Sequence, residues 1–162
     1  MRHALLALGL ACLLLADCVG ELEPGSVSPA GIPDPITVAR TGRPNDWLIC
    51  RSGTCKAEPS EAAQIYPVPA DALWAAWRTV LAEQPDVTVI AADASRRLIM
   101  VQDRTPVFRF VDTITIRVLP LEQGASTFAA YSRSEIGHAD AGTNRHRLRA
   151  WVAVLEQRLD SR

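Results

Sequence analysis

The chain has 162 residues, with 17 Lys and Arg against 18 Asp and Glu, and its formal net charge at pH 7 is −1. Hydrophobic residues make up 48% of the sequence, which is enough for a packed core in a chain of this length. A nearly neutral chain lacks the strongly basic stripe of a nucleic-acid-binding protein. The composition therefore excludes that class, and we expect no nucleic-acid partner.

The first 18 residues have the layout of a secretory signal peptide. Arg2 and His3 precede an apolar run that extends from Ala4 to Ala16. The run is shorter than the roughly 20 apolar residues that a membrane-spanning helix needs. We therefore predict that residues 1–18 direct export, and that the chain works on the periplasmic side of the cell envelope.

The end of this segment, Leu15-Ala16-Asp17-Cys18, resembles a bacterial lipoprotein box, in which the cysteine becomes the lipid-modified first residue of the mature chain. Asp17 departs from that pattern, because the residue before the cysteine is normally small and uncharged. Ordinary signal-peptide cleavage near this point is the alternative. A lipidated Cys18 would make the membrane a partner, because several acyl chains anchor a protein stably.

Residues 19–46 are rich in proline and glycine, which predicts an extended tether that buries almost nothing and holds a domain away from a surface. The remainder, residues 47–162, is long enough for a single α+β domain with one core. Within it, Cys50 and Cys55 flank a short polar loop. In an exported chain this pair favours a disulfide over metal ligation or free thiols.

The secondary structure of the predicted domain begins with a helix, because apolar residues recur at helical spacing from Asp71 to Gln84. Two short segments rich in branched residues follow, Val87–Asp93 and Leu98–Thr105. Their composition and the turn between them predict a β-hairpin.

The third predicted strand, Val107 to Leu119, shows clear alternation. Its apolar face carries Phe108, Phe110, Ile114, Ile116 and Val118. Asp112 falls on the same face, where a carboxylate is costly unless it is paired. We expect an arginine to pair with Asp112, in preference to a bulge that would rotate it outward.

A fourth strand, about Ala125 to Ser134, leads through residues 135–142 into a C-terminal helix that Thr143 or a neighbour caps. The apolar stripe of this helix consists of Leu148, Trp151, Val152, Leu155 and Leu159. We therefore predict an α+β fold with one helix, a four-stranded antiparallel sheet and a C-terminal helix. Both helices lie on one face in a helix-grip-like arrangement, which can leave an apolar groove.

Two motifs in this region resemble the signature of a known family. They are Phe108–Asp112 and, after it, Ser132–Ser134, Gly137, Asp140, Gly142, Asn144–Arg145 and Arg147. Over roughly Trp47 to Leu159 the chain resembles domain of unknown function 1499, in the bacterial branch with a lipoprotein-like N-terminus. That family has no established activity. The resemblance implies an exported or membrane-associated domain and leaves the chemistry open.

Arginines, acids and an asparagine gather in these motifs and form the candidate site. The residues are Arg109, Asp112, Arg133, Asp140, Asn144, Arg145 and Arg147. In one interpretation they form an ion-pair network that fixes the strand–loop–helix junction to Asp112. In the other, arginines at the helix start bind an anionic group such as a phospholipid head or a cell-wall carboxylate. The two differ in whether one guanidinium is left unpaired and reachable by solvent.

The sequence predicts a non-catalytic module that binds an anionic or apolar ligand or an envelope protein, with no cofactor. The alternative is a metal-dependent envelope hydrolase that uses His138, Asp140 and His146, because histidine and carboxylate suit zinc or iron. We assign no catalytic residue and no metal site, since no further ligand is visible near these residues.

Overall fold

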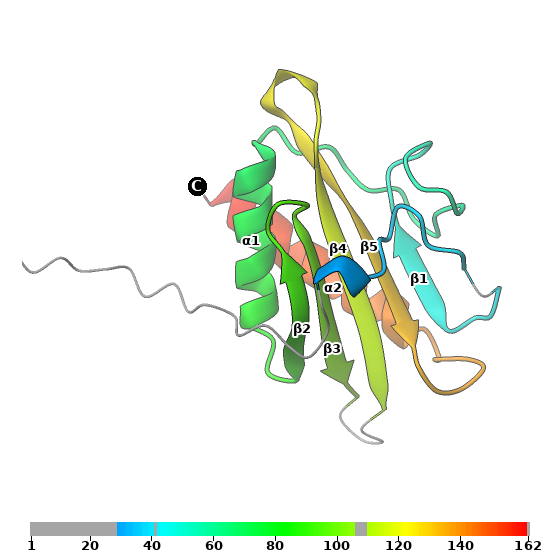
Figure 1. Cartoon of the computed structure of the whole chain (residues 1–162). Helices are drawn as coiled ribbons and strands as arrows, with labels where there is room; N and C mark the ends of the chain where they lie inside the picture. The colour runs from blue at the N-terminus through cyan, green and yellow to red at the C-terminus, as the bar shows by residue number, and fades with distance from the viewer. Residues whose placement is uncertain (1–28, 41, 106–109, 162) are drawn as a thin grey trace, which may run out of the picture.

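The computed structural model describes residues 29–40, 42–105 and 110–161. The predicted signal peptide, Cys18 and residues 19–28 of the predicted tether lie outside this range, as do Phe108 and Arg109. The elements are β1 Asp46–Ile49, α1 Ala70–Ala82, β2 Val87–Asp93, β3 Leu98–Arg104, β4 Val111–Pro120, β5 Ser126–Ser134 and α2 Thr143–Asp160 (Figure 1). No helix within the described ranges is long and apolar enough to cross a membrane.

The strands form one antiparallel sheet in the order β1-β5-β4-β3-β2. The α+β class and the hairpin of β2 and β3 are confirmed, but the sheet has five strands where the sequence predicted four. The additional strand is β1, in which Asp46 pairs with Arg133 of β5. A strand of 4 residues is too short to show the alternation that identifies a strand in a sequence.

The start of the long central strand also differs from the prediction. We expected Phe110 on a buried face, but β4 begins at Val111 and Phe110 is 45% exposed. The prediction was wrong because Phe110 lies before the first residue of β4, where its backbone N–H and its carbonyl both bond to Thr105. Ile114 and Ile116 are buried as predicted.

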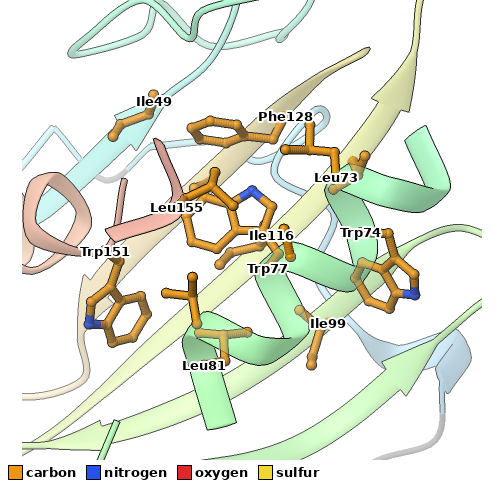
Figure 2. Packing of buried hydrophobic residues seen from close by; sticks show 14 of the residues in the cluster. Ile49, Leu73, Trp74, Trp77, Leu81, Ile99, Ile116, Phe128, Trp151 and Leu155 are labelled. Carbon is orange, nitrogen blue, oxygen red and sulfur yellow. The ribbon is translucent and has the colours of Figure 1, made fainter. Parts of the chain in front are cut away.

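Both helices pack on the same face of the sheet, as predicted (Figure 2). Helix α1 contributes Leu73 and Trp77, and α2 contributes Trp151 and Leu155. On the sheet they meet Ile99, Val101, Ile114, Ile116, Val118, Phe128 and Ala130. Trp77 is fully buried and contacts Phe128 edge-on, with ring centroids 5.0 Å apart. The apolar stripes of the two helices therefore build the core that the sequence predicted.

The opposite face of the sheet is covered by residues 30–40, which we name the strap. Leu98 and Met100 alternate along β3 with residues that face the helices, so their side chains point the other way. Ile32 of the strap packs against them and is only 4% exposed. The prediction that residues 19–46 form a tether that buries almost nothing is therefore wrong for the part that the structure describes.

Asp34 fastens the strap to the sheet. Its carboxylate accepts hydrogen bonds from Arg96 on the β2–β3 turn, at 3.1 Å, and from Arg117 on β4. It also accepts the backbone N–H of Ile36 at 3.0 Å. Proline and glycine do not prevent packing in an extended segment when apolar side chains and a paired carboxylate stand between them.

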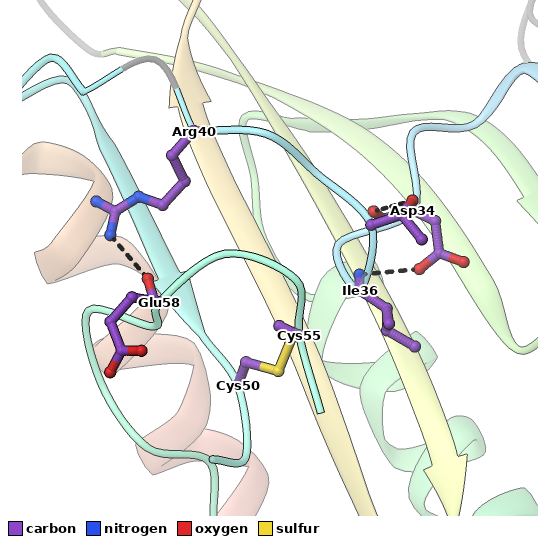
Figure 3. Close-up of a disulfide and its surroundings, with 7 residues drawn as sticks. Asp34, Ile36, Arg40, Cys50, Cys55 and Glu58 are labelled. Atoms are coloured by element: carbon purple, nitrogen blue, oxygen red, sulfur yellow. Dashed lines mark hydrogen bonds between the residues drawn. A yellow bond between two sulfur atoms is a disulfide. The ribbon is translucent and has the colours of Figure 1, made fainter. Parts of the chain in front are cut away.

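Cys50 and Cys55 form the predicted disulfide after the end of β1 (Figure 3). The loop around the disulfide, residues 50–58, lies against the strap. Ile36 packs against the same cluster as the buried Cys50, and Arg40 donates from Nη1 to the carbonyl of Glu58 at 3.2 Å. The loop and the strap therefore support each other on this face of the sheet.

We expect Asp34→Ala to lower the free energy of unfolding by about 2 kcal/mol, because it leaves two guanidinium groups without their hydrogen-bond acceptor. Urea denaturation measures this loss. Asp71→Ala is the matched control, since Asp71 also pairs with an arginine, Arg97, but its side chain is 82% exposed. The control should lose less than about 1 kcal/mol. Equal losses would contradict the anchoring role of Asp34.

Candidate functional site

A buried ion pair joins the sheet to the start of α2. Asp112 on β4 is 1% exposed, and Arg147 Nη2 donates to its Oδ2 at 2.6 Å. The Nε of Arg147 donates to Asp103 Oδ2, also at 2.6 Å. Asp103 and Asp112 are direct partners across β3 and β4, where two like charges would repel. Arg147 bridges both carboxylates, so an arginine and not a bulge accounts for Asp112, as the sequence predicted.

Asn144 connects this ion pair to the neighbouring strand and loop. Its Oδ1 accepts hydrogen bonds from Ser132 Oγ at 2.5 Å and from Arg147 Nη1 at 2.9 Å. Its Nδ2 donates to Ser134 Oγ at 3.0 Å and to Asp140 Oδ2 at 2.6 Å. Asn144 is fully buried. A buried amide with partners on both its oxygen and its nitrogen holds the helix start in one position.

Asp140 organises the turn into α2. Its carboxylate accepts the backbone N–H groups of Gly142 and Asn144, each at 2.9 Å. Gly142 has a φ of 83°, in the left-handed region that favours glycine. The sequence suggested Thr143 or a neighbour as the cap, and the side chain that satisfies the amides is that of Asp140. Its negative charge also stabilises the positive end of the helix dipole.

These contacts form what we name the junction network: Asp103, Asp112, Ser132, Ser134, Asp140, Asn144 and Arg147. The sequence predicted four of its members as site residues and missed Asp103 and the roles of the two serines. Strand pairing was the missing signal, since Asp103 becomes a partner of Arg147 only through its register with Asp112. The contacts of the network join β3, β4 and β5 to the start of α2.

Arg133 does not belong to the junction network, although the sequence placed it there. Ser132 and Ser134 point toward α2, so the residue between them points to the other face of the sheet. Arg133 instead donates to Glu135 at 3.0 Å. Burial alone would raise the pKa of Glu135, but hydrogen bonds from Thr113 and Arg133 outweigh it and hold that pKa below its usual value.

Arg145 also lies outside the junction network and lines a surface cavity instead. The cavity has a volume of about 380 Å³ and is bounded by Arg40, Arg43, Pro44, Asp46, Trp47, Asp140, Ala141, Gly142 and Arg145. We name it the arginine cavity. The guanidinium of Arg145 lies over the ring of Trp47, 5.7 Å from its centroid. Among the described residues no carboxylate forms an ion pair with Arg145, and its buried Nε has no hydrogen-bond partner.

The carboxylates that border the arginine cavity are already engaged. Asp46 is fully buried and accepts hydrogen bonds from Arg40 at 2.5 Å and from the Tyr131 hydroxyl at 2.9 Å. Burial and the hydrogen bond to Asp46 raise the pKa of Tyr131 well above its usual value, so this hydroxyl stays a donor. Asp140 is held by the amides of the helix start. Arg145 therefore gives the cavity wall a positive charge that no carboxylate of the described residues pairs with.

The residues proposed for a metal site do not come together. His138 and His146 are both exposed. Within the described ranges, no group of three or more His, Cys, Asp or Glu side chains is placed to hold a metal ion. The engaged carboxylate of Asp140 adds no support, so the structure offers nothing in favour of the metal-dependent hydrolase.

A family model described as "Protein of unknown function (DUF1499)" matches residues 32–155. The match begins within the strap, in agreement with its packing on the sheet. Among solved structures the chain is similar to "Crystal structure of Ara h 8.0201", with 10% sequence identity and a TM-score of 0.48, over 62% of this chain and 95% of that chain. That similarity is too distant to carry an argument. No curated protein matches the chain.

We expect Arg147→Ala to lower the free energy of unfolding by about 3–5 kcal/mol, because it leaves the buried carboxylate of Asp112 unpaired. Arg145→Ala should lose less than about 1 kcal/mol, since it breaks no ion pair with a described residue. Urea denaturation of both variants at pH 7 measures the difference. A loss for Arg145→Ala as large as that for Arg147→Ala would contradict the division of roles.

Proposed function

Because the chain belongs to the DUF1499 family of proteins of unknown function, we propose a function from its geometry. The protein is an exported, lipid-anchored domain of the cell envelope that binds an anionic ligand without catalysis. The ligand lies in the arginine cavity, and its negative group pairs with Arg145.

The observation that carries this proposal is the state of Arg145. A partly buried guanidinium that pairs with no carboxylate of the described residues has lost part of its hydration without gaining an ion pair from them. An anion that enters the cavity would supply that partner. Arginine suits this task because its planar fork can form paired hydrogen bonds with a carboxylate or a phosphate.

The surroundings of Arg145 favour an anion over a cation. Three of the side chains that line the cavity are arginines and two are aspartates, and the charge of Arg40 is offset by Asp46. Trp47 offers its ring face to the guanidinium, which limits its orientations before a ligand arrives. A side chain that is already ordered loses less conformational entropy on binding.

The proposed location rests on the N-terminal pattern and on the cysteines. A signal-like segment ends at Cys18, as in the bacterial lipoprotein-like branch of the family. The bond between Cys50 and Cys55 is typical of proteins in oxidising compartments such as the periplasm.

The helix-grip-like arrangement stays part of the proposal, but the proposed ligand does not lie between the helices and the sheet. An apolar ligand between the helices and the sheet would have to displace Trp77 and Phe128, which fill that space (Figure 2). The arginine cavity lies instead at the end of the sheet where β5 leads into α2.

Mass spectrometry of the mature protein, purified gently from its own envelope, tests the anchor. We expect a chain that begins at a lipid-modified Cys18 and contains the Cys50–Cys55 disulfide. Cys18→Ser should abolish the incorporation of labelled palmitate into the protein. A mature chain that begins at another residue and carries no lipid would contradict the anchor and leave the binding site unaffected.

Isothermal titration with acetate and with inorganic phosphate tests the site. We expect at least one of these anions to bind the mature protein, and Arg145→Gln to weaken that binding about tenfold or more, because it removes the charge-assisted pair. Arg149→Gln is the matched control. Arg149 also lies over Trp47, at 5.9 Å, but it pairs with Glu61 and does not line the cavity.

The control should bind as tightly as the unchanged protein. Equal binding by the Arg145→Gln variant, or no binding of either anion, would overturn the proposed site. Unfolding curves of both variants show whether the fold is intact, so that a loss of binding is not confused with a loss of structure.

A further inference from the structure

We propose that the anion in the arginine cavity is the phosphate of a phospholipid headgroup, and that this end of the domain docks on the bilayer. The inference rests on the proposed function and narrows its ligand. It draws on the reach of the tether, on the apolar side chains beside the cavity and on the chemistry of the cavity wall.

The packing of the strap shortens the tether. In a chain anchored at Cys18, only residues 19–28 stand between the lipid and the described domain. About ten residues span at most about 35 Å when fully extended. A folded domain of about 130 residues has a radius of gyration of about 14 Å. The tether can therefore lift the domain from the membrane by no more than about its own diameter, which keeps headgroups at a high effective concentration.

The loop between β5 and α2, which borders the cavity at Asp140, Ala141 and Gly142, also carries an exposed apolar side chain. Asp140 of this loop donates its backbone N–H to the carbonyl of Pro44 at 3.3 Å, and the two residues border the cavity together. Gly137 accepts a hydrogen bond from Asn45 at 3.0 Å, so the loop lies against the segment before β1. The residue before Gly137 is Ile136, which is 63% exposed.

A second apolar side chain lies at the same end of the sheet. Asp112 and Ser134 are cross-strand partners, and Glu135 donates its N–H to the carbonyl of Val111 at 3.3 Å. Phe110 directly precedes β4 and Ile136 follows the end of β5 by two residues, so both lie near this end of the sheet. Phe110 is 45% exposed. Exposed apolar side chains next to a cationic site are the combination by which proteins bind the surface of an anionic bilayer.

The cavity wall favours a phosphate over a carboxylate. Guanidinium groups from separate segments, those of Arg40, Arg43 and Arg145, line a space of about 380 Å³. A carboxylate has two oxygens, which one arginine fork can occupy fully. A phosphate diester keeps bridging oxygens besides its two charged ones, and a monoester has three, so a phosphate that pairs with Arg145 has oxygens left to accept from a further donor of the cavity wall.

Vesicle flotation and anion titration test the inference together. All variants carry Cys18→Ser in the full chain, so that the lipid is absent and any contribution of the N-terminal segment is the same in each. The vesicles contain phosphatidylcholine alone, or phosphatidylcholine with about a third phosphatidylglycerol. Titrations use inorganic phosphate, glycerol phosphate and acetate.

We expect the protein to float with the vesicles that contain phosphatidylglycerol, and much less with phosphatidylcholine alone. Arg145→Gln and Ile136→Ser should each lower the bound fraction several-fold. Ile65→Ser is the matched control, because Ile65 is 55% exposed and does not border the arginine cavity. The control should bind like the parent chain. Glycerol phosphate should bind more tightly than acetate, in an Arg145-dependent way.

Four results would overturn the inference. Arg145-dependent binding of inorganic phosphate without vesicle binding would identify a free phosphate as the ligand. Arg145-dependent binding of acetate, with no binding of phosphate or vesicles, would leave the proposed function standing and exclude the lipid headgroup. Vesicle binding that is unchanged by both Arg145→Gln and Ile136→Ser would place the membrane contact elsewhere. If no anion and no vesicle binds, both the inference and the proposed function fail.

Discussion

The buried carboxylate of Asp112 is the constraint on which this end of the molecule depends. A charge that is 1% exposed must be paired, and Arg147 is the group that pairs with it. That contact fixes the rotation of α2 about its axis and its position along β4. Asn144 and Asp140 then extend the same set of hydrogen bonds to β5 and to the loop before the helix. The pairing of the buried Asp112 therefore also determines where α2 holds Arg145 at the surface.

Helix geometry separates the two arginines that the sequence places side by side. Each residue of an α-helix advances about 100° around the axis, so Arg145 lies about 200° from Arg147. When Arg147 points into the sheet, Arg145 must point away from it, toward Trp47 and the segment before β1. Within the part of the chain that the structure describes, Arg147 pairs with two carboxylates and Arg145 pairs with none. The buried pair of Arg147 and Asp112 thereby determines that Arg145 is the arginine that a ligand can reach.

Much of the fold could be predicted from the sequence because it follows from local periodicity. The stripes of α1 and α2, the hairpin of β2 and β3 and the pairing of Asp112 with an arginine all have this origin. Strand β1 and the strap could not be found in this way. Their short extended segments show no periodicity, and tertiary contacts such as those of Ile32 and Asp34 stabilise them.

The sequence predicted which residues gather at the candidate site, but it did not predict which way their side chains point. Period-two counting from Ser132 and Ser134 could have excluded Arg133 from the helix-facing side. Asn144, Arg147, Leu148 and Trp151 follow the spacing of one buried helix face, which could have separated Arg147 from Arg145. The arginine cavity itself needed the structure, because its wall includes Arg40 and Arg43 from a segment assigned to the tether.

The most direct test of this account is an NMR measurement of the arginine Nε–H groups of the mature protein during titration with glycerol phosphate. The account predicts that the Arg145 signal shifts with the ligand, while the Arg147 signal is protected from exchange and stays unchanged. A shift of Arg147 without a shift of Arg145, or an Arg147 that exchanges freely with solvent, would contradict the division between a structural and a ligand-binding arginine.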